Sequence, residues 1–310
     1  MNQSPHAALQ ARIRGPVFPI PVPFQTTGDF AVDHDALARY VDWLVGEGAP
    51  VILVTVGTSR FNLLSVEEMR AVNETVVRAV AKRAVCIVAG PLQGSTRDNV
   101  EFARHAAQIG ADAIMVMYPE RFYGEEAIFG FYKEVSEAGA PVMIHEMPMR
   151  NGLGGGTVQF SLDLLDRLTD LPGLIGLKEE AGDAEYVYRV LRRIAHKTAL
   201  IGAGSMRRFM RDYHAGAQCY LVGIGNFLPK VEIDFYAAMM RRDFDSAHDL
   251  VRKNEDGFFD LAVSLGWHRV LKEMMEIFGL MSAQERPPFE RVDPAGRAKL
   301  DAKVRELGWK

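Results

Sequence analysis

Residues 174–180 read Leu174-Ile175-Gly176-Leu177-Lys178-Glu179-Glu180: large apolar residues and a glycine lead into one lysine, and the chain then turns acidic. Short parallel strands that are buried on both faces are near-continuous apolar runs of this kind. The pattern therefore predicts a buried strand whose last inward residue, Lys178, lies at the rim of a core.

Lys178 is a candidate nucleophile. Burial disfavours the charged ammonium form of a lysine, and the neutral amine is the form that condenses with a carbonyl to give a Schiff base. The alternative for this stretch is a structural lysine that is solvated or paired with a neighbouring glutamate. The stretch by itself leaves both interpretations open.

The run at residues 174–178 is one of eight short apolar runs that alternate with helical patterns. The predicted strands lie within residues 17–24, 51–56, 84–89, 113–117, 142–145, 174–178, 199–201 and 219–222. Such alternation predicts a parallel sheet covered by helices. Eight units favour a closed (β/α)8 TIM barrel over a doubly wound open sheet, and no GxGxxG motif follows the first strand to support dinucleotide binding. We predict that the barrel, an α/β fold, spans residues 15–228.

The alternation stops at Pro229, and only helical patterns follow. Amphipathic patterns occupy residues 231–240, 244–264 and 267–278, and a highly charged last helix is expected at residues 294–307. We predict that residues 229–310 form a C-terminal three-helix extension, completed by that charged helix and packed on the barrel.

Composition limits the classes of partner. The 310-residue chain has 36 basic and 40 acidic residues and a formal charge of -4, which argues against a nucleic-acid or anionic-membrane surface. It has no apolar stretch of about 20 residues, the length that spans a bilayer, and no apolar signal-peptide core. Cys86 and Cys219 lie inside apolar runs, as buried thiols do in a reducing compartment. We expect a cytoplasmic protein that binds neither nucleic acid nor membrane.

The chemistry of a (β/α)8 barrel lies at the C-terminal ends of its strands. There the sequence places a Gly57-Thr58-Ser59 turn after the second strand, His145 at the end of the fifth strand and Lys178 at the end of the sixth. Backbone N–H groups and hydroxyls of such a turn can hold a small carboxylate, and a lysine can condense with a ketone. The combination suits a 2-oxo acid held as an iminium. His145 and Glu146 point to opposite faces of their strand, so we expect no metal and no cofactor.

These residues resemble the dihydrodipicolinate synthase / N-acetylneuraminate lyase superfamily of class I, Schiff-base aldolases. The resemblance covers the whole chain, from Gly15-Pro16 to the helical tail. Its specific motifs are Gly57-Thr58-Ser59 for the family's Gly-Thr-Thr, Pro148-Met149-Arg150-Asn151-Gly152 for Pro-x-Arg-Thr-Gly, Gly176-Leu177-Lys178-Glu179 for Gly-Ile-Lys-Glu, and Gly225-Asn226 after the eighth strand.

The resemblance implies a role for each matching residue. Lys178 would form an imine with pyruvate or a related 2-oxo acid, while Thr58 and Ser59 would bind the carboxylate. Arg150 would position the substrate or brace its loop, and Leu221 of the eighth strand joins the substrate-binding set. The resemblance also implies a homotetramer, built as a dimer of dimers.

Three departures from the family pattern bear on the activity. Arg60-Phe61 stands where the family continues with Gly-Glu, and Arg60 is either a contact for an anionic substrate or a solvated or salt-bridged loop residue. His145 stands where the family has its proton-carrying tyrosine. A histidine can shuttle a proton near neutral pH, or it can be a core residue hydrogen-bonded to a neighbour. Glu120 lies near the position of a second family tyrosine, for which Tyr118 or Tyr123 could substitute. Because both family tyrosines are missing from their matching positions, lysine biosynthesis itself is disfavoured.

The leading hypothesis is a Schiff-base lyase, an aldolase or a dehydratase/hydratase, with Lys178 as nucleophile and His145 as acid/base. The alternative is a catalytically altered barrel that binds or senses 2-oxo acids. A third hypothesis is a barrel enzyme that binds a phosphate ligand through the loops after the seventh and eighth strands, where Gly202, Gly204, Arg207 and Arg208 lie.

Overall fold

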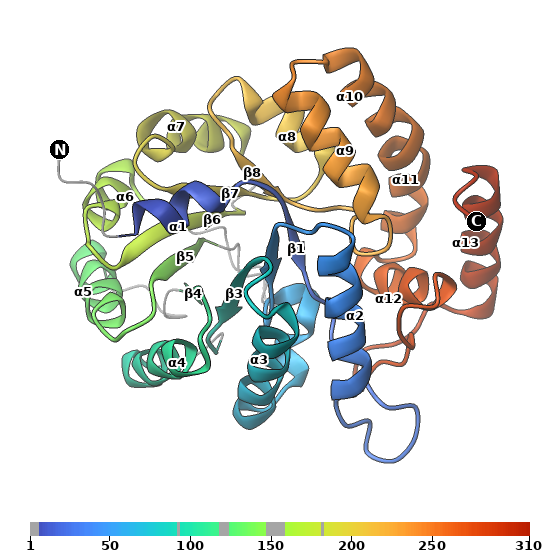
Figure 1. Cartoon of the computed structure of the whole chain (residues 1–310), viewed down its shortest axis with the longest axis horizontal. Helices are drawn as coiled ribbons and strands as arrows, with labels where there is room; N and C mark the ends of the chain where they lie inside the picture. Colours follow the sequence, from blue (N-terminus) through green and yellow to red (C-terminus); the bar gives the residue numbers. More distant parts are fainter. Residues whose placement is uncertain (1–5, 92–93, 118–123, 147–158, 181–182) are drawn as a thin grey trace.

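Each of the eight predicted apolar runs forms a strand, and the strands close into one parallel barrel in chain order (Figure 1). The computed structural model describes residues 6–91, 94–117, 124–146, 159–180 and 183–310. The strands are β1 (Gly15–Pro19), β2 (Val51–Leu53), β3 (Val85–Ala89), β4 (Ala113–Met117), β5 (Val142–Glu146), β6 (Leu174–Glu179), β7 (Ala199–Gly202) and β8 (Cys219–Leu221). The predicted (β/α)8 barrel is confirmed.

β2 is shorter than predicted, because it ends at Leu53 and not at Val56. Thr55 has a φ of 59°, a left-handed conformation that turns the chain out of the strand. Its buried hydroxyl donates toward the carbonyl of Ala89 (3.0 Å) and accepts from the Ala89 amide (3.0 Å). A side-chain hydroxyl therefore replaces the backbone ladder at this point and allows the turn that carries Thr58 to begin.

Helices surround the barrel and cover its outer face (Figure 1). They are α2 (His34–Gly46), α3 (Val66–Val80), α4 (Thr96–Ile109), α5 (Glu125–Ser136), α6 (Leu162–Thr169), α7 (Ala184–Ile194), α8 (Met206–Tyr213) and α9 (Pro229–Met240). A capping box begins α3, with Ser65 and Glu68 each accepting from the other's amide. α9 packs on β1 and α8, so it occupies the place of an outer helix after β8.

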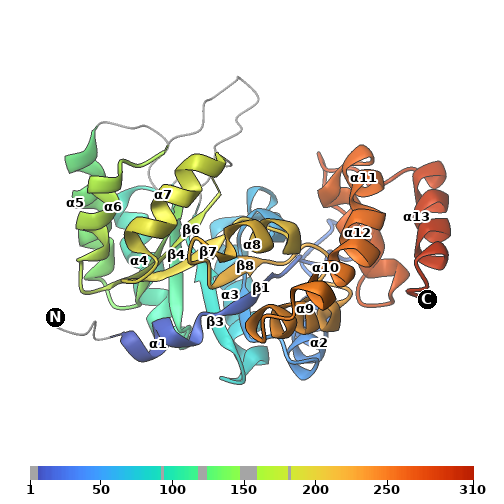
Figure 2. The ribbon, with the colours of Figure 1, turned by 90° about the horizontal axis from the view of Figure 1, so that it is seen from above.

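The short helix α1 (Ala7–Arg12) covers the N-terminal end of the barrel (Figure 2). Ile13, directly after α1, packs into the interior cluster, and the Gln10 side chain donates to the Ile175 carbonyl (3.2 Å). This end is therefore filled by apolar side chains, and the strand ends that carry the candidate site lie at the opposite end.

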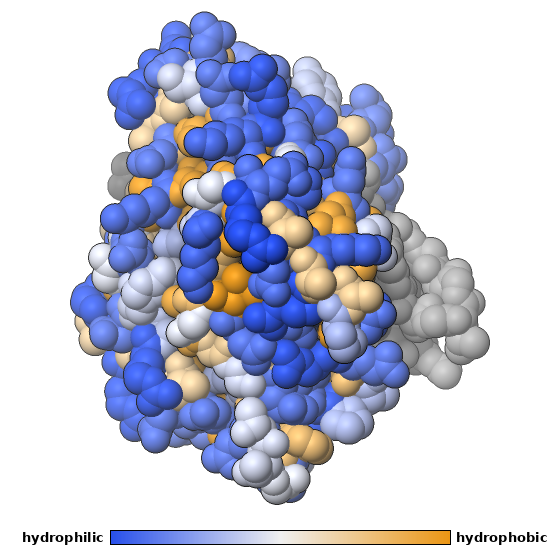
Figure 3. All heavy atoms as spheres, turned by 90° about the vertical axis from the view of Figure 1, so that its right-hand side faces the viewer, coloured by the Kyte–Doolittle hydropathy of each residue, from blue (hydrophilic) through white to orange (hydrophobic). Residues whose placement is uncertain are grey.

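The C-terminal extension lies to one side of the barrel (Figures 1 and 2). Of the predicted extension, residues 229–310, α9 packs on the barrel, and the rest comprises α10 (Phe244–Leu250), the π-helical segment η3 (Val251–Asp256), α11 (Gly257–Ser264), α12 (Trp267–Ile277) and α13 (Pro294–Glu306). One helix was expected over residues 244–264, and η3 divides it. Seen from this side, the surface is mostly hydrophilic, with small separate hydrophobic patches (Figure 3). Among the described helices, none has the length and apolar character needed to cross a membrane.

One extra residue in β6 determines which way Lys178 faces. Val142 of β5 pairs with Leu174, but the next residue, Met143, pairs with Gly176, so Ile175 is unmatched. Such a β-bulge shifts the alternation of side chains by one position. Ile175 already belongs to the barrel interior, and without the bulge Lys178 would face the outer helices.

Gly176 is the residue that makes the bulge sterically possible. A Cβ atom at this position would lie 2.5 Å from Met143 Cε and 2.7 Å from the Ala199 carbonyl oxygen. The methionine terminus can move, but the carbonyl belongs to the neighbouring strand β7. A side chain at 176 would therefore push β6 away from β7.

We predict that Gly176→Ala lowers the free energy of unfolding by about 1–3 kcal/mol, the usual effect of overpacking a core. Urea unfolding of the purified variant measures it. Gly46→Ala is the matched control, since no atom lies within 4 Å of its added Cβ and the site is helical. If Gly176→Ala is as stable as Gly46→Ala, the close approach to β7 is not a constraint.

Candidate active site

Lys178 and His145 lie side by side at the C-terminal ends of β6 and β5, where the strand register pairs them directly. Both side chains are 2% exposed. The distance from Lys178 Nζ to His145 Nε2 is 2.8 Å. The two residues that the sequence nominated for catalysis are thus brought together by the backbone ladder.

Glu180 is the third member of this group. Its Oε2 atom forms an ion pair with Lys178 Nζ and lies 3.1 Å from His145 Nε2. A neutral imidazole carries a proton on one ring nitrogen only, so Nε2 either accepts from Lys178 or donates to Glu180. The three atoms therefore form a triangle in which protons can be exchanged.

The charges in this triangle shift the pKa values of its members. Burial, followed by the charge of Lys178, lowers the pKa of His145 to about 4, although Glu180 acts in the opposite direction. Burial opposes ionisation of Glu180, but the Lys178 charge and the hydrogen bonds of His145 and Lys178 outweigh it. They hold the pKa of that carboxyl well below its usual range. At neutral pH the site contains a neutral imidazole and a carboxylate.

Glu146 faces away from this triangle, as expected for the residue next to His145 in a strand. Its Oε1 atom accepts from the Tyr186 hydroxyl (2.6 Å) and the Phe160 amide (2.6 Å), which lie on the helical side of β5. Burial raises the pKa of Glu146 to about 7. These hydrogen bonds connect the end of β5 to α7 and to the segment before α6. They therefore hold the backbone that carries His145 in place.

The turn predicted to bind a carboxylate divides its two hydroxyls between different roles. Ser59 is fully buried, and its Oγ atom donates to the Ile20 carbonyl (2.6 Å) and accepts from the Val56 amide (3.3 Å). Ser59 therefore holds the turn against the segment after β1. Within the described ranges no comparable bond engages the hydroxyl of Thr58, whose exposure is 9%.

Arg60 is a buried structural residue. Its guanidinium donates to Glu285 Oε1 from Nε (3.0 Å) and Nη2 (2.5 Å), to the Thr58 carbonyl (3.1 Å) and to the His268 carbonyl (2.7 Å). Both charged side chains are essentially unexposed. Of the two readings of Arg60, the salt-bridged residue is the one found. It anchors the Thr58 turn to the C-terminal extension.

Of the remaining residues predicted from the sequence, the structure describes Leu221 but not Arg150 or Glu120. Leu221 ends β8 beside Val17 of β1 and packs at the edge of the interior cluster. Arg150 and Glu120 lie outside the described residues. Thr58 follows β2 and Lys178 lies near the end of β6, and these strands are four apart around the barrel.

Two buried carboxylates occupy the loops after β7 and β8. Glu255 accepts from the amides of Met206 (2.8 Å) and Arg207 (3.1 Å) at the start of α8. Glu232 accepts from the amides of Gly223 (2.9 Å) and Ile224 (3.1 Å). These are the backbone donors that would bind a phosphate, and the chain's own carboxylates already engage them. The arrangement argues against the phosphate-ligand hypothesis.

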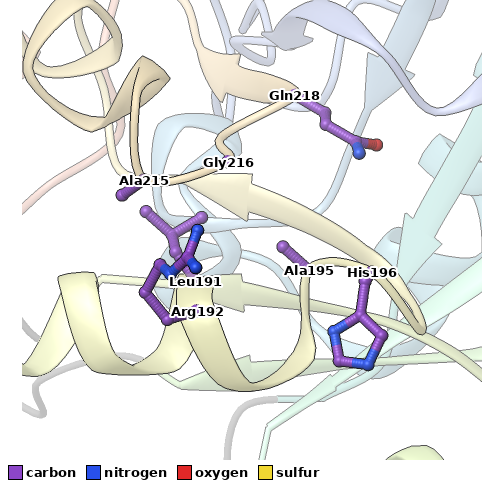
Figure 4. Close-up of a pocket in the computed structure, with 7 residues that line it drawn as sticks. All are labelled: Leu191, Arg192, Ala195, His196, Ala215, Gly216 and Gln218. Carbon is purple, nitrogen blue, oxygen red and sulfur yellow. The ribbon is translucent and has the colours of Figure 1, made fainter.

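A cavity of about 350 Å³ lies at the other end of the barrel, between α7 and the segment that leads into β8 (Figure 4). Leu191, Arg192, Ala195, His196, Ala215, Gly216 and Gln218 line it. None of these was predicted as a site residue. Within the ranges that the structure describes, no three His, Cys, Asp or Glu side chains are grouped so that they could hold a metal ion.

Glu180 is the site residue that the sequence reasoning missed. Glu179 and Glu180 form the acidic turn after Lys178, and the sequence pattern predicts no role for Glu180. Its signal was its spacing, because residues i and i+2 of an extended segment point to the same side. That signal is weak here, since β6 ends at Glu179 and a strand end does not oblige the next residue to continue the alternation.

Comparisons with known proteins show the family of the chain. The sequence model of the Dihydrodipicolinate synthetase family matches residues 12–307. The 4-hydroxy-tetrahydrodipicolinate synthase of Jannaschia sp. (strain CCS1) is 28% identical over 284 residues, which cover 90% of this chain and 93% of the relative. An Acinetobacter baumannii (strain AB307-0294) protein named "Probable 5-dehydro-4-deoxyglucarate dehydratase" is 27% identical and covers 94% of each chain. Dihydrodipicolinate synthase from Bacillus clausii shares the fold, with a TM-score of 0.85 at 23% identity, covering 97% of this chain and 99% of its own.

We predict that Arg60→Ala lowers the free energy of unfolding by about 3–5 kcal/mol, because it leaves the buried Glu285 carboxylate without its partner. Urea denaturation measures the change. Arg97→Ala is the control, since the Arg97 side chain is 86% exposed in its pair with Glu101, and such pairs contribute about 0–1 kcal/mol. Equal stabilities of the two variants would contradict a structural role for Arg60.

A second prediction concerns acid stability. The pKa of His145 is about 4 in the folded chain against an ordinary value of 6.5, so between these values the unfolded chain holds a proton that the folded chain lacks. Folding stability should therefore fall as the pH falls through this window, by roughly 3 kcal/mol in total from this group.

Urea unfolding of wild type and His145→Gln between pH 7 and pH 4 tests this linkage. The variant should lose less stability than the wild type as the medium becomes acidic. Parallel curves for the two proteins would show that His145 takes up its proton equally in the folded and unfolded states.

Proposed function

Since the chain belongs to the Dihydrodipicolinate synthetase family, we propose that it is a Schiff-base-forming lyase that acts on pyruvate or a related 2-oxo acid through Lys178. The observation that carries the proposal is the buried contact between Lys178 Nζ and His145 Nε2 at the strand ends. A lysine beside a neutral imidazole can condense with a ketone once it has lost a proton, and the imidazole can exchange protons with the adduct. The names of the relatives, a synthase and a dehydratase, support a lyase in general.

In the proposed reaction, the amine of Lys178 forms a bond to C2 of the 2-oxo acid, and water leaves to give an iminium. The iminium withdraws electrons from C3, so a bond at C3 can be made or broken. His145, neutral at working pH, serves as the base for a proton of the substrate. Thr58 offers its hydroxyl to the substrate carboxylate, and Leu221 and Arg150 complete the substrate-binding set.

The sensor alternative explains less of the site. A barrel that only bound 2-oxo acids would not need a buried lysine in contact with two groups that can move protons. The relatives reported above also carry the names of enzymes. A homotetrameric state and a cytoplasmic location remain part of the proposal, on the strength of the resemblance alone.

We predict a covalent adduct when the protein is incubated with pyruvate and borohydride, because borohydride reduces an iminium to a stable secondary amine. Intact-mass measurement should show a pyruvate-sized increment on the wild type and none on Lys178→Ala. Lys82→Ala serves as the control, since the Lys82 side chain is 64% exposed and precedes β3, at the N-terminal ends of the strands; it should be labelled like the wild type.

The outcome separates the hypotheses. If Lys178→Ala is labelled, a lysine other than Lys178 forms the Schiff base. If the wild type stays unlabelled with pyruvate and also with larger 2-oxo acids, the Schiff-base proposal fails and the sensor alternative takes its place.

A further inference from the structure

We propose that Glu180 is a catalytic residue that relays protons between Lys178 and the substrate oxygen during imine formation. The inference rests on the proposed function and adds a residue to it. Glu180 is in direct contact with the reacting atom, because its Oε2 atom forms an ion pair with Lys178 Nζ. No other carboxylate forms an ion pair with this lysine among the residues that the structure describes.

The need for such a group follows from the starting state. In the ion pair, Lys178 is an ammonium, whose nitrogen has no free electron pair with which to attack a carbonyl. One proton must leave before the C–N bond can form. Among the described residues, Glu180 Oε2 is the carboxylate oxygen paired with Lys178 Nζ, so it is in position to take this proton. His145 Nε2 lies 3.1 Å from the same Oε2 atom.

The step balances in protons and electrons. Glu180 takes one proton from the ammonium, and the amine's electron pair forms the bond to C2 while the C=O π pair moves to oxygen. Glu180 gives its proton to that oxygen and takes a second proton from nitrogen. It then delivers the second proton as water leaves and the nitrogen pair forms the iminium. Two protons pass from nitrogen to oxygen, one water is released, and Glu180 ends as a carboxylate beside the iminium.

The environment favours Glu180 over His145 for this relay. Burial, followed by the Lys178 charge, lowers the pKa of His145 to about 4, and burial continues to act against the imidazolium after that charge is removed. The carboxyl of Glu180 owes its low pKa to the charge of Lys178 and to hydrogen bonds, while burial acts in the opposite direction. Once the ammonium has given up its proton, that charge is gone and burial favours the protonated carboxyl.

Glu180 also has solvent access, and three basic side chains act on its carboxylate. About a third of its side chain (32%) is exposed, whereas Lys178 and His145 are enclosed. The charged and titratable groups that act on it from the described elements are Lys178 on β6, His145 on β5 and His268 on α12. The relay therefore lies at the solvent-facing edge of the triangle, where substrate and water enter and leave.

Glu180→Gln tests the relay, because it keeps the shape of the side chain and removes its ability to take a proton. Two rates are measured on wild type and variant from pH 6 to pH 9: borohydride trapping with pyruvate, and carbamylation of Lys178 by cyanate, read by peptide mass. We expect trapping to become about a hundredfold slower at neutral pH, within the usual range for loss of a general acid/base. Carbamylation should become faster, since the amine has lost its counter-ion.

The opposite movement of the two rates distinguishes a relay from other roles. A structural role would slow both reactions, and a purely electrostatic role would accelerate both; either result overturns the proposal. Glu180→Asp keeps the carboxyl and should restore part of the trapping rate. If the wild type is trapped by neither pyruvate nor larger 2-oxo acids, the proposed function itself fails. If it is trapped and Glu180→Gln is trapped equally fast, only the relay fails.

Discussion

The orientation of Lys178 depends on the bulge in β6. Ile175 and Gly176 together oppose the single residue Met143, and this one-residue shift places Lys178 in the same register position as His145. The bulge needs a residue without a side chain at 176, because the Ala199 carbonyl oxygen of β7 lies only 2.7 Å from the position of a Cβ. A steric constraint between two strands is thus the condition for the contact on which the proposed chemistry rests.

The C-terminal extension contributes to the same end of the barrel. The Arg60–Glu285 pair links the Thr58 turn to the segment after α12, and Lys272 of α12 donates to the Val22 carbonyl (2.9 Å) while burial lowers its pKa to about 7. Buried charges are costly, and they persist where partners fix their geometry. The extension therefore holds the turns after β1 and β2 in place, and its helices are part of the site's support.

Much of the fold could be predicted because it follows from patterns that are local in sequence. Apolar runs at regular spacing predicted all eight strands. The early end of β2 could not be predicted, since it depends on a bond between Thr55 and Ala89, 34 residues later. The fate of Arg60 was open for the same reason: Glu285 lies 225 residues away along the chain.

By itself, the sequence determined the barrel, the family resemblance and the identity of Lys178 and His145 as neighbours at the strand ends. These features follow from periodicity and from short motifs. Only the tertiary structure decided that Ser59 braces the turn, that Glu180 contacts both Lys178 and His145, and that Glu255 and Glu232 engage the backbone amides after β7 and β8. The physical reason is that a hydrogen bond or an ion pair commits a side chain to one partner, and that partner is chosen by the packing of distant segments.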